Sequence, residues 1–464
     1  MLLPPWEEDR MQSPSPRRPI SVLAVLPSQE PLIDSAMATL ERRPPRIPLE
    51  EAKTPPGLVL DPNFAAVPIG TGVPGEMSLE AVAPTQSRDF VVRAFVEVSD
   101  PSEVPVERDG RPLFADPLIA TFPTCPNSPA VGGVPDVEAR LRTAALAGRG
   151  LDGQGVAIAV LDTGINLAHL RSKLGTVPLF DAGNSWTPPR GTTAPGTYPV
   201  NHGTMCAFDA LIAAPKATLL DFSILSTRVP GGAMTGSTLA VAVQAFAQLI
   251  AFWGVAFAPG GAPRYKALVV NNSWGVYHPS WDFPPGHPGR YIDNPRHPFQ
   301  GLVSVLAGAG ADILFAAGNC GADCPANECQ GRVTGTIMGA NASPDVLTLA
   351  GCDVTDTRVG YSSQGPSIAG LYQQKPDLTA YTHFLGSDAF GPGVPDNGTS
   401  AACPVAAGCV AALRTKLTPQ AVPPPNLFAQ LTASARQVVP SPGWNGDYGH
   451  GIIDPDAAAA GFGV

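Results

Sequence analysis

Residues 156–166 read VAIAVLDTGIN, a run of six apolar residues that ends directly before Asp162. A run without polar alternation is typical of a strand that is buried on both faces, as in a parallel sheet covered by helices. The carboxylate of Asp162 would then lie at the carboxyl end of this strand, where burial is costly unless a partner group faces it. The stretch therefore predicts a class of fold and the position of a site.

Further strand-like runs alternate with helix-like stretches along the rest of the chain. This alternation predicts an α/β fold, a doubly wound and mainly parallel sheet flanked by helices, with an N-terminal extension. In such sheets, sites gather beyond the carboxyl ends of the strands. The expected strands are 156–161, 218–225, 266–273, 312–317 and 346–350, and the expected helices are 136–147 (capped by Asp136), 203–213, 235–253, 296–309 and 400–415.

The front third of the chain has a different composition, since it holds nearly half of the 53 prolines. Residues 1–85 mix proline with charge and show no sustained periodicity, which predicts an extended or partly disordered arm. Apolar spacing in 90–98 and 112–122 predicts strands on either side of the turn signal Asp109-Gly110. We therefore expect a small β-containing element over residues 86–135.

Composition and charge limit the partners of the chain. Of its 464 residues, 44% are hydrophobic and 15% are charged, and its net charge is −10. An average soluble domain carries about 25% charged residues, so this chain should bury a large core. No block of lysine and arginine offers the positive surface that nucleic acid requires, and we expect no nucleic-acid partner.

One segment, 238–258, carries no charge over a length that could span a bilayer. Gln244 and Gln248 are four residues apart, however, so they share one helix face and favour a helix against a protein core. The chain begins MLLPPWEEDR, where a signal peptide would have a basic segment. We therefore expect cytoplasmic localisation and no membrane partner, with export by a non-classical route left open.

Asp162 alone would more often be a turn residue before Thr-Gly. Asp-Thr-Gly is also typical of aspartic proteases, which need two such carboxylates, so that mechanism would require a homodimer of this chain. His202 begins a helix-like stretch 40 residues later, and both side chains can reach the same edge of the sheet. The histidines of a segment rich in proline and glycine are expected to be exposed; they are His278, His287 and His297.

Ser400 stands in NGTSAACP, residues 397–404, before a run of small residues that suits a closely packed helix. The serine could cap this helix, or it could be a nucleophile at the positive end of the helix dipole. Pro404 is expected in the first turn, where its missing N–H costs least. Asn319 follows another strand and could donate to an oxyanion or serve as a turn residue.

Taken together, four segments resemble the signature segments of the subtilisin-like serine proteases, the subtilases of peptidase family S8. They are VAIAVLDTGI with Asp162, HGT with His202, AAGN with Asn319 and GTSAACP with Ser400, in that order along the chain. The resemblance covers about 136–464, and its further matches are SWG at 273–275, YSSQGP at 361–366, KPDLTA at 375–380 and YGHGIIDPDAAAA at 448–460.

The resemblance implies a serine endopeptidase that works through an acyl-enzyme intermediate. It makes Ser400 the nucleophile, His202 the general base and then the general acid, and Asp162 the group that stabilises the imidazolium. Asn319 would share the oxyanion with the backbone N–H of Ser400. The residues implied to bind the substrate are Ser273, Trp274, Gly275, Ala316, Ala317 and Gly318.

Some positions depart from the family pattern. Asn201 replaces a usual glycine, Met205 replaces a common second histidine, and Ala-Ala-Cys-Pro-Val follows Ser400 instead of Met-Ala-Ser/Thr-Pro-His. TAYTH at 379–383 also lacks the family's Ala-Pro-Gly. These changes bear on pocket shape and substrate preference. Cys206 stands four residues after His202, as a free cysteine does in members similar to proteinase K, and should lie beneath the histidine.

The sequence contains no clear motif for a metal ion or a cofactor. Cys320, Cys324 and Cys329 form a C-x3-C-x4-C cluster without a nearby fourth ligand, so a local disulfide or free thiols are favoured over zinc. We expect no metal in the catalytic site and no required cofactor. Subtilases often bind calcium, but the chain has no D-x-[DN]-x-[DN]-G loop, and structural calcium remains open.

These observations divide the chain into an arm (1–85), a small element with the position of a propeptide (86–135) and a peptidase domain (136–464). The N-terminal extension would inhibit the cleft or dock a partner, and the substrate would be a protein or peptide that is processed selectively. Two alternatives remain. One is a catalytically silent protein of the same fold that binds peptides by strand addition along 273–275. The other is a dimeric aspartic protease using Asp162.

Overall fold

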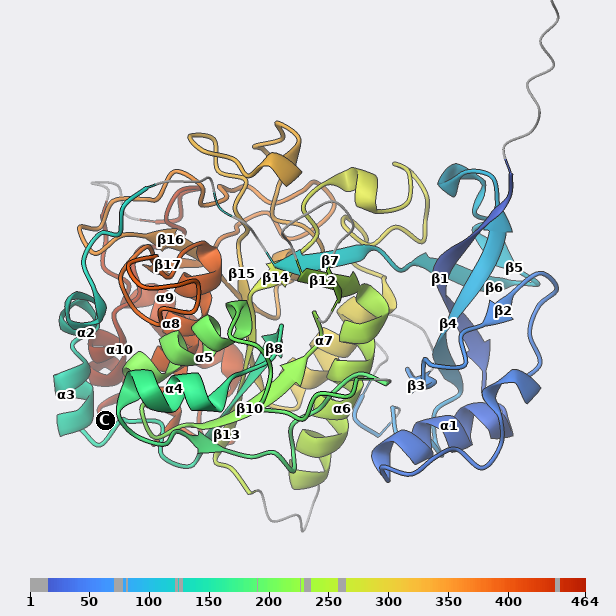
Figure 1. Cartoon of the computed structure of the whole chain (residues 1–464), viewed down its shortest axis with the longest axis horizontal. Helices are drawn as coiled ribbons and strands as arrows, with labels where there is room; N and C mark the ends of the chain where they lie inside the picture. The colour runs from blue at the N-terminus through green and yellow to red at the C-terminus, as the bar shows by residue number, and fades with distance from the viewer. Residues whose placement is uncertain are drawn as a thin grey trace, which may run out of the picture.

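The computed structural model describes residues 16–70, 78–80, 82–121, 124, 128–189, 191–225, 227–228, 235–257, 264–438 and 443–464. Its largest element is a seven-stranded sheet in which every neighbouring pair is parallel (Figure 1). The predicted α/β fold with a parallel sheet is therefore confirmed. The strands lie in the order β17 (Leu378–Tyr381), β16 (Leu347–Cys352), β15 (Asp312–Ala316), β13 (Ala267–Asn272), β8 (Val156–Asp162), β10 (Thr218–Ser223) and β9 (Leu179–Phe180).

Helices cover both faces of this sheet because the side chains of each strand alternate between two cores. In β8, Ile158 and Val160 join the core beneath α5 (His202–Ala213) and α8 (Thr399–Arg414), while Leu161 joins the core shared with α6 (Leu239–Phe257) and α7 (Pro298–Gly308). A strand buried on both faces must be apolar throughout, which explains the run at 156–161. The remaining helices are α1 (Glu30–Leu40), α2 (Val134–Leu141), α3 (Thr143–Gly148), α4 (Leu167–Leu174), α9 (Pro424–Ala433) and α10 (Pro455–Phe462).

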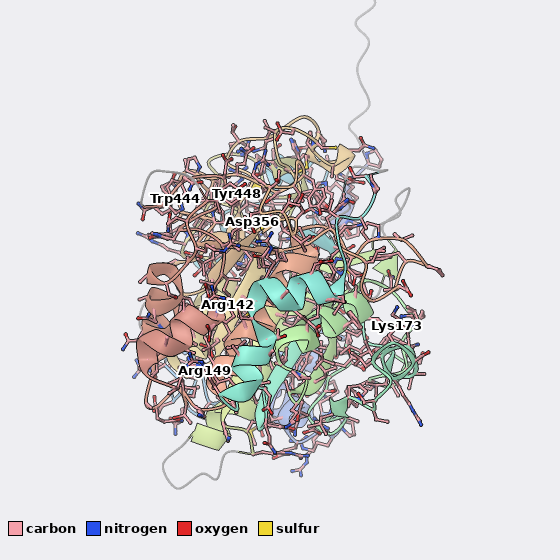
Figure 2. All side chains as sticks on the ribbon, turned by 90° about the vertical axis from the view of Figure 1, so that its left-hand side faces the viewer. Arg142, Arg149, Lys173, Asp356, Trp444 and Tyr448 are labelled. Carbon is pink, nitrogen blue, oxygen red and sulfur yellow. A yellow bond between two sulfur atoms is a disulfide. The ribbon has the colours of Figure 1, made fainter. Side chains whose placement is uncertain are left out.

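The helix expected from Asp136 to Ala147 is two helices, α2 and α3. They meet at Arg142, whose backbone is left-handed with φ 55°. Asp136 is not the N-cap but the third residue of α2, and its carboxylate accepts from the N–H of Gly133 at 2.8 Å. Arg142 and Arg149 extend from this segment to Asp456 at the C-terminal side, on the face away from the N-terminal sheet (Figure 2).

The expectation of an extended arm over residues 1–85 is wrong for the part that the structure describes. Residues 18–27 form β1, which pairs with β4 (Asp89–Val98) along its whole length, from Arg18 opposite Val98 to Pro27 opposite Asp89. The prolines of β1 stand near its ends, where a missing N–H is tolerated. This antiparallel sheet also contains β2 (Val59–Leu60), β3 (Val67–Pro68), β5 (Glu107–Arg108) and β6 (Arg111–Ala115).

The turn at Asp109-Gly110 is confirmed, with positive φ at both residues between β5 and β6. The strand expected over 112–122 is instead two strands that belong to different sheets. After β6, Asp116 and Pro117 lie outside both strands, and the chain continues as β7 (Leu118–Thr121). There it lies between β12 (Thr235–Thr238) and β14 (Trp274–Gly275), in a sheet that also contains β11 (Thr227–Arg228).

Residues 276–300 hold the N-terminal sheet against the larger part of the molecule. Nε2 of His287 lies 3.1 Å from the carbonyl oxygen of Val104, and Nε2 of His297 lies 3.0 Å from that of Ala115. His297 is only 1% exposed, so the expectation of exposed histidines is wrong for this residue, and burial lowers its pKa to about 4. At Gly289 a Cβ atom would lie 2.0 Å from the carbonyl oxygen of Leu113, so this close approach requires glycine.

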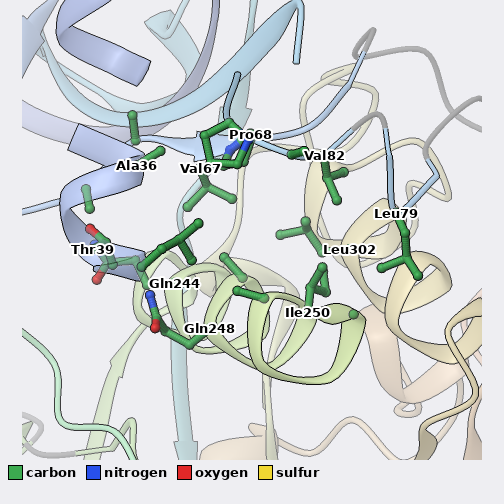
Figure 3. Close-up of a pocket in the computed structure, with 18 of the residues that line it drawn as sticks. Ala36, Thr39, Val67, Pro68, Leu79, Val82, Gln244, Gln248, Ile250 and Leu302 are labelled. Atoms are coloured by element: carbon green, nitrogen blue, oxygen red, sulfur yellow. The ribbon is translucent and has the colours of Figure 1, made fainter. Parts of the chain in front are cut away.

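The uncharged segment at 238–258 contributes α6, which packs against α7, as predicted for a core helix. Among the described residues, no helix combines the length and the apolar character that crossing a membrane would need. Gln244 and Gln248 share one face of α6, and this face borders a cavity of about 400 Å³ (Figure 3). Val67 and Pro68 of β3 line its other side, so the cavity lies between the N-terminal sheet and the helical layer.

Candidate active site

Asp162 and His202 meet at the carboxyl end of β8. Asp162 is the last residue of the strand and is fully buried, and both of its carboxylate oxygens lie 2.9 Å from Nδ1 of His202. The N–H of Thr163 donates to the same carboxylate at 2.7 Å. A buried carboxylate needs such partners, and the contact with Nδ1 holds the imidazole with Nε2 directed away from Asp162.

His202 is the first residue of α5, and its position is fixed by the loop after Asp162. The side chain of Asn201 caps the helix by accepting from the N–H of His202 at 2.9 Å. The N–H of Gly203 donates to the hydroxyl of Thr163 at 2.8 Å, and a Cβ atom at Gly203 would lie 2.7 Å from the carbonyl oxygen of Gly164. Nε2 of His202 is buried and has no hydrogen-bond partner among the described residues.

Ser400 is the second residue of α8, and its hydroxyl donates to the carbonyl oxygen of Ser273 at 3.3 Å. The interpretation of Ser400 as an N-cap is wrong, because the N-cap is Gly398, with φ 79°. The expected place of Pro404 in the first turn is also wrong, since it is the sixth helical residue.

Pro404 cannot donate to the carbonyl group four residues earlier, which belongs to Ser400. That carbonyl instead accepts from the hydroxyl of Ser273 at 3.1 Å and from the thiol of Cys206 at 3.4 Å. The proline thus frees a carbonyl group that ties the start of α8 to the end of β13 and to α5.

Asn319 follows β15 and is fully buried. Its Oδ1 accepts from the N–H of Thr399 at 2.9 Å and from the hydroxyl of Thr399 at 3.1 Å. The same hydroxyl accepts from the N–H of Gly318 at 2.9 Å. These contacts fix the amide so that its Nδ2 lies at Gly398, where a Cβ atom would come within 2.8 Å. Sequence reasoning missed Thr399, although its place beside Ser400 in GTS was a signal.

The residues expected to bind substrate lie on two neighbouring segments, which we call the two walls of the site: β14, and the end of β15 with the residues that follow it. Trp274 and Gly275 form β14, and Ala316 ends β15 on the other side. Nδ2 of Asn341 donates to the carbonyl oxygens of Trp274 at 3.0 Å and of Ala316 at 2.8 Å, and so joins the walls. Asn341 is buried and was not predicted, since nothing in its local sequence distinguishes it.

The edge of β14 that was expected to bind substrate is paired with β7 of the same chain. In the antiparallel register of β7 and β14, Trp274 lies opposite Thr121 and Gly275 lies opposite Ala120. The N-terminal part of the molecule therefore runs along the strand that was expected to bind an extended peptide (Figure 1).

Burial shifts the pKa of several groups around this site. Cys206 lies with its Sγ 3.6 Å from Oδ2 of Asp162 and 3.7 Å from Nδ1 of His202, as expected from the sequence. Burial, and then the charge of Asp162, raise the pKa of its thiol well above the usual range. Burial also raises the pKa of Asp221 to about 7, although its carboxylate accepts from the N–H groups of Ile165 and Gly196.

The donor set at the site does not suit calcium. Among the described residues, one group of three acidic, imidazole or thiol side chains is close enough to share an ion, namely Asp162, His202 and Cys206. A thiol and an imidazole do not suit calcium, which prefers oxygen ligands. Cys320 and Cys329 form a disulfide beside Asn319, so neither is free to bind zinc.

Known proteins resemble this chain in sequence. A family model described as the subtilase family matches residues 153–451. The chain is 31% identical to human membrane-bound transcription factor site-1 protease over 169 residues, which cover 34% of this chain and 14% of that protein. It is 27% identical to serine protease AprX of Bacillus subtilis over 244 residues, covering 50% and 47%. It is 28% identical to a calcium-dependent protease of Trichormus variabilis over 301 residues, covering 57% and 39%.

The chain thus spans less than half the length of each of these relatives. Among solved structures, MycP1 from the ESX-1 type VII secretion system is similar with a TM-score of 0.48 and 22% identity, over 74% of this chain and 90% of that one.

Proposed function

The chain belongs to the subtilase family, and from this premise we propose that it is a serine endopeptidase that uses Asp162, His202 and Ser400. One observation carries the proposal most strongly. Nδ1 of His202 is held 2.9 Å from both oxygens of a fully buried Asp162, which leaves Nε2 without a competing partner among the described residues. A neutral imidazole held in this way is suited to take a proton from a hydroxyl near pH 7.

In the proposed reaction, the hydroxyl of Ser400 leaves the carbonyl oxygen of Ser273 and turns toward Nε2 of His202. Such hydrogen bonds are often loose without substrate and tighten when it binds. His202 removes the proton as Ser400 attacks the peptide carbonyl, and then gives it to the leaving amine. The Nδ2 group of Asn319 and the N–H of Ser400 donate to the oxyanion, and Thr399 keeps the amide of Asn319 in the required orientation.

The substrate that suits this site is an extended peptide. Backbone groups along β14 offer an edge for strand addition, and Asn341 fixes that edge relative to Ala316, where Ala317 and Gly318 continue the wall. We propose selective processing of a protein substrate rather than general digestion. The support is the β7 segment, because access to β14 requires that the N-terminal part moves away.

We also propose that the N-terminal part, including residues 86–135, acts as an inhibitory, propeptide-like element. Ala120 is paired on one side with Gly236 of β12 and on the other with Gly275 of β14. A proline at position 120 therefore removes a ladder hydrogen bond on whichever side the N–H points. Ala120→Pro should raise the rate of peptide hydrolysis, whereas the matched control Asp109→Asn, in the distant β5–β6 turn, should not. If both variants hydrolysed the peptide at the same rate, and each unfolded at the same temperature as the parent chain, the inhibitory role of the N-terminal part would be refuted.

The protease class is tested with a peptide substrate and two inhibitors. A serine-directed phosphonate should abolish hydrolysis, and pepstatin should leave it unchanged. The opposite result would favour an aspartic mechanism through Asp162, although that carboxylate is already engaged by His202 and Thr163. Absence of hydrolysis in the wild type and in Ala120→Pro would favour a silent peptide-binding protein.

The disulfide and the donor set at the site bear on the compartment of the protein and on its requirement for ions. The disulfide between Cys320 and Cys329 supports an oxidising compartment rather than the expected cytoplasm, since disulfides persist mainly in such compartments. The proposed acyl transfer uses side chains and backbone N–H groups alone and requires no cofactor. The name of the relative from Trichormus variabilis concerns calcium in that protein, and the donor set around Asp162 does not fit this ion.

A further inference from the structure

Two buried carboxyl groups outside the catalytic residues interact with each other, namely Asp209 of α5 and Asp396 of the loop that leads to Ser400. We propose that they share one proton, and that this contact positions the helix of His202 relative to the loop of Ser400. The inference rests on the proposed function only for its effect on catalysis. The shared proton itself can be observed without any activity.

Asp209 is the member of the pair that lacks other partners. It follows His202 by seven residues in α5, which is about two turns, so both side chains lie on the same side of the helix. Its side chain is fully buried, and neither of its oxygens accepts from an N–H or O–H group of the described residues. An isolated buried carboxylate without donors is strongly unfavourable, whereas the protonated acid can itself donate to Asp396.

Asp396 is the member of the pair whose negative charge is stabilised by hydrogen-bond donors. Both of its carboxylate oxygens are occupied, one by the N–H and the other by the hydroxyl of Ser387, each at 2.5 Å. Its backbone pairs with Phe384, and Ser400 follows four residues later. A Cβ atom at Gly386 would lie 2.2 Å from Oδ2 of Asp396, so glycine leaves the space that this carboxylate occupies.

The titratable groups on the elements around this pair have partners of their own. Asp388 is paired with Lys173 of α4, and Nε2 of His169 of α4 lies 2.7 Å from the carbonyl oxygen of Ser387 (Lys173 is labelled in Figure 2). On α5 itself, Cys206 is a buried thiol with a raised pKa. Burial, followed by the charge of Asp396, raises the pKa of Asp209 well above its ordinary value.

Loss of the shared proton would place two negative charges in contact inside the protein. Like charges in such a site repel strongly, so the pair would separate at alkaline pH. Since one carboxylate belongs to α5 and the other to the loop before α8, this separation would move His202 relative to Ser400. The proposal therefore predicts an alkaline decline in activity that belongs to this pair rather than to His202.

The first test is difference infrared spectroscopy of the full chain at pH 8. The wild type should show the carbonyl band of a protonated carboxyl group, and Asp209→Asn should lack it. The matched control is Asp221→Asn, because the pKa of Asp221 is raised only to about 7 and this group is mostly ionised at pH 8. The control should retain the band. A wild type without the band, or a band that appears only after calcium and sodium are removed, would overturn the shared proton.

The second test is the pH profile of kcat/KM. In Asp209→Asn the amide still donates to Asp396 but cannot lose a proton, so activity should persist at alkaline pH where the wild type declines. Asp209→Ala should lower kcat/KM about tenfold at all pH values, or about 1.4 kcal/mol in the barrier, and Asp209→Asn should restore it. An unchanged alkaline decline in Asp209→Asn would refute the positioning role. A band without hydrolysis in any variant would refute the proposed function instead.

Discussion

Replacing Asp162 with asparagine tests the electrostatic part of the mechanism. During proton transfer His202 becomes an imidazolium whose Nδ1 lies 2.9 Å from both oxygens of Asp162. With about 4 Å between the charge centres and an effective dielectric constant of about 20, the attraction is about 4 kcal/mol. Loss of this attraction should lower kcat about 10³-fold, since each 1.36 kcal/mol changes a rate tenfold. An amide can also present its NH₂ group to Nδ1 and so favour the wrong tautomer.

The assay compares kcat and KM for a peptide ester in wild type, Asp162→Asn and the control Asp152→Asn. Asp152 pairs with Lys216 and makes no contact with the site, so its change removes a carboxylate charge without disturbing His202. We expect a fall in kcat with a nearly constant KM for Asp162→Asn and no change for the control. If Asp162→Asn stayed within tenfold of the wild type, the carboxylate would not stabilise the imidazolium and the reasoning would fail.

Three further predictions concern residues around the triad. Asn319→Ala should lower kcat about 10²–10³-fold, the known effect of removing one such donor in subtilisin, a member of this family, and an intact rate would end the oxyanion assignment. Because the pKa of Asp221 rises from 3.8 to about 7 on folding, the folded state binds the proton more tightly and wild-type stability falls as pH rises from about 4 to 7. Between pH 5 and pH 8 this loss is about 3 kcal/mol in denaturant unfolding; Asp221→Asn should remove it, and identical pH dependence in both proteins would contradict the assignment. A mercurial should inhibit the wild type but not Cys206→Ala, and equal inhibition would place the reactive thiol elsewhere.

The parallel sheet could be predicted because its information is local. A strand buried on both faces must be apolar throughout, and the run before Asp162 shows this without any knowledge of its neighbours. The pairing of Asp162 with His202 could also be anticipated, since both follow or begin elements at the same edge of the sheet. Cys206 followed from its spacing on the same helix as His202.

Contacts between distant segments could not be read in this way. The high proline content hid β1, whose partner β4 lies more than sixty residues further along the chain. The split of 112–122 into β6 and β7 depends on two separate sheets that the apolar spacing alone does not distinguish. Asp209 and Asp396 come together only when α5 packs against α8. This packing is close, since a Cβ atom at Gly408 would lie 2.3 Å from the carbonyl oxygen of Ala210.

Two predictions about the start of α8 are wrong. The sequence placed Ser400 at the N-cap, a position that would serve both a cap and a nucleophile, whereas in the structure the N-cap is Gly398 and Ser400 is the second helical residue. Pro404 lies deeper in the helix because the carbonyl group that it leaves free has donors in Ser273 and Cys206. Propensity rules describe an isolated helix, and here tertiary contacts satisfy the group that the proline leaves unpaired.

The most direct test of the central claim is covalent labelling of the full chain with a fluorophosphonate, followed by mass spectrometry of the modified peptide. The serine nucleophile proposed here predicts a single adduct on Ser400, absent in Ser400→Ala and retained in Ser280→Ala, which changes a serine in an exposed contact. An adduct on another residue, or no adduct even in Ala120→Pro, where the edge of β14 is released, would contradict it.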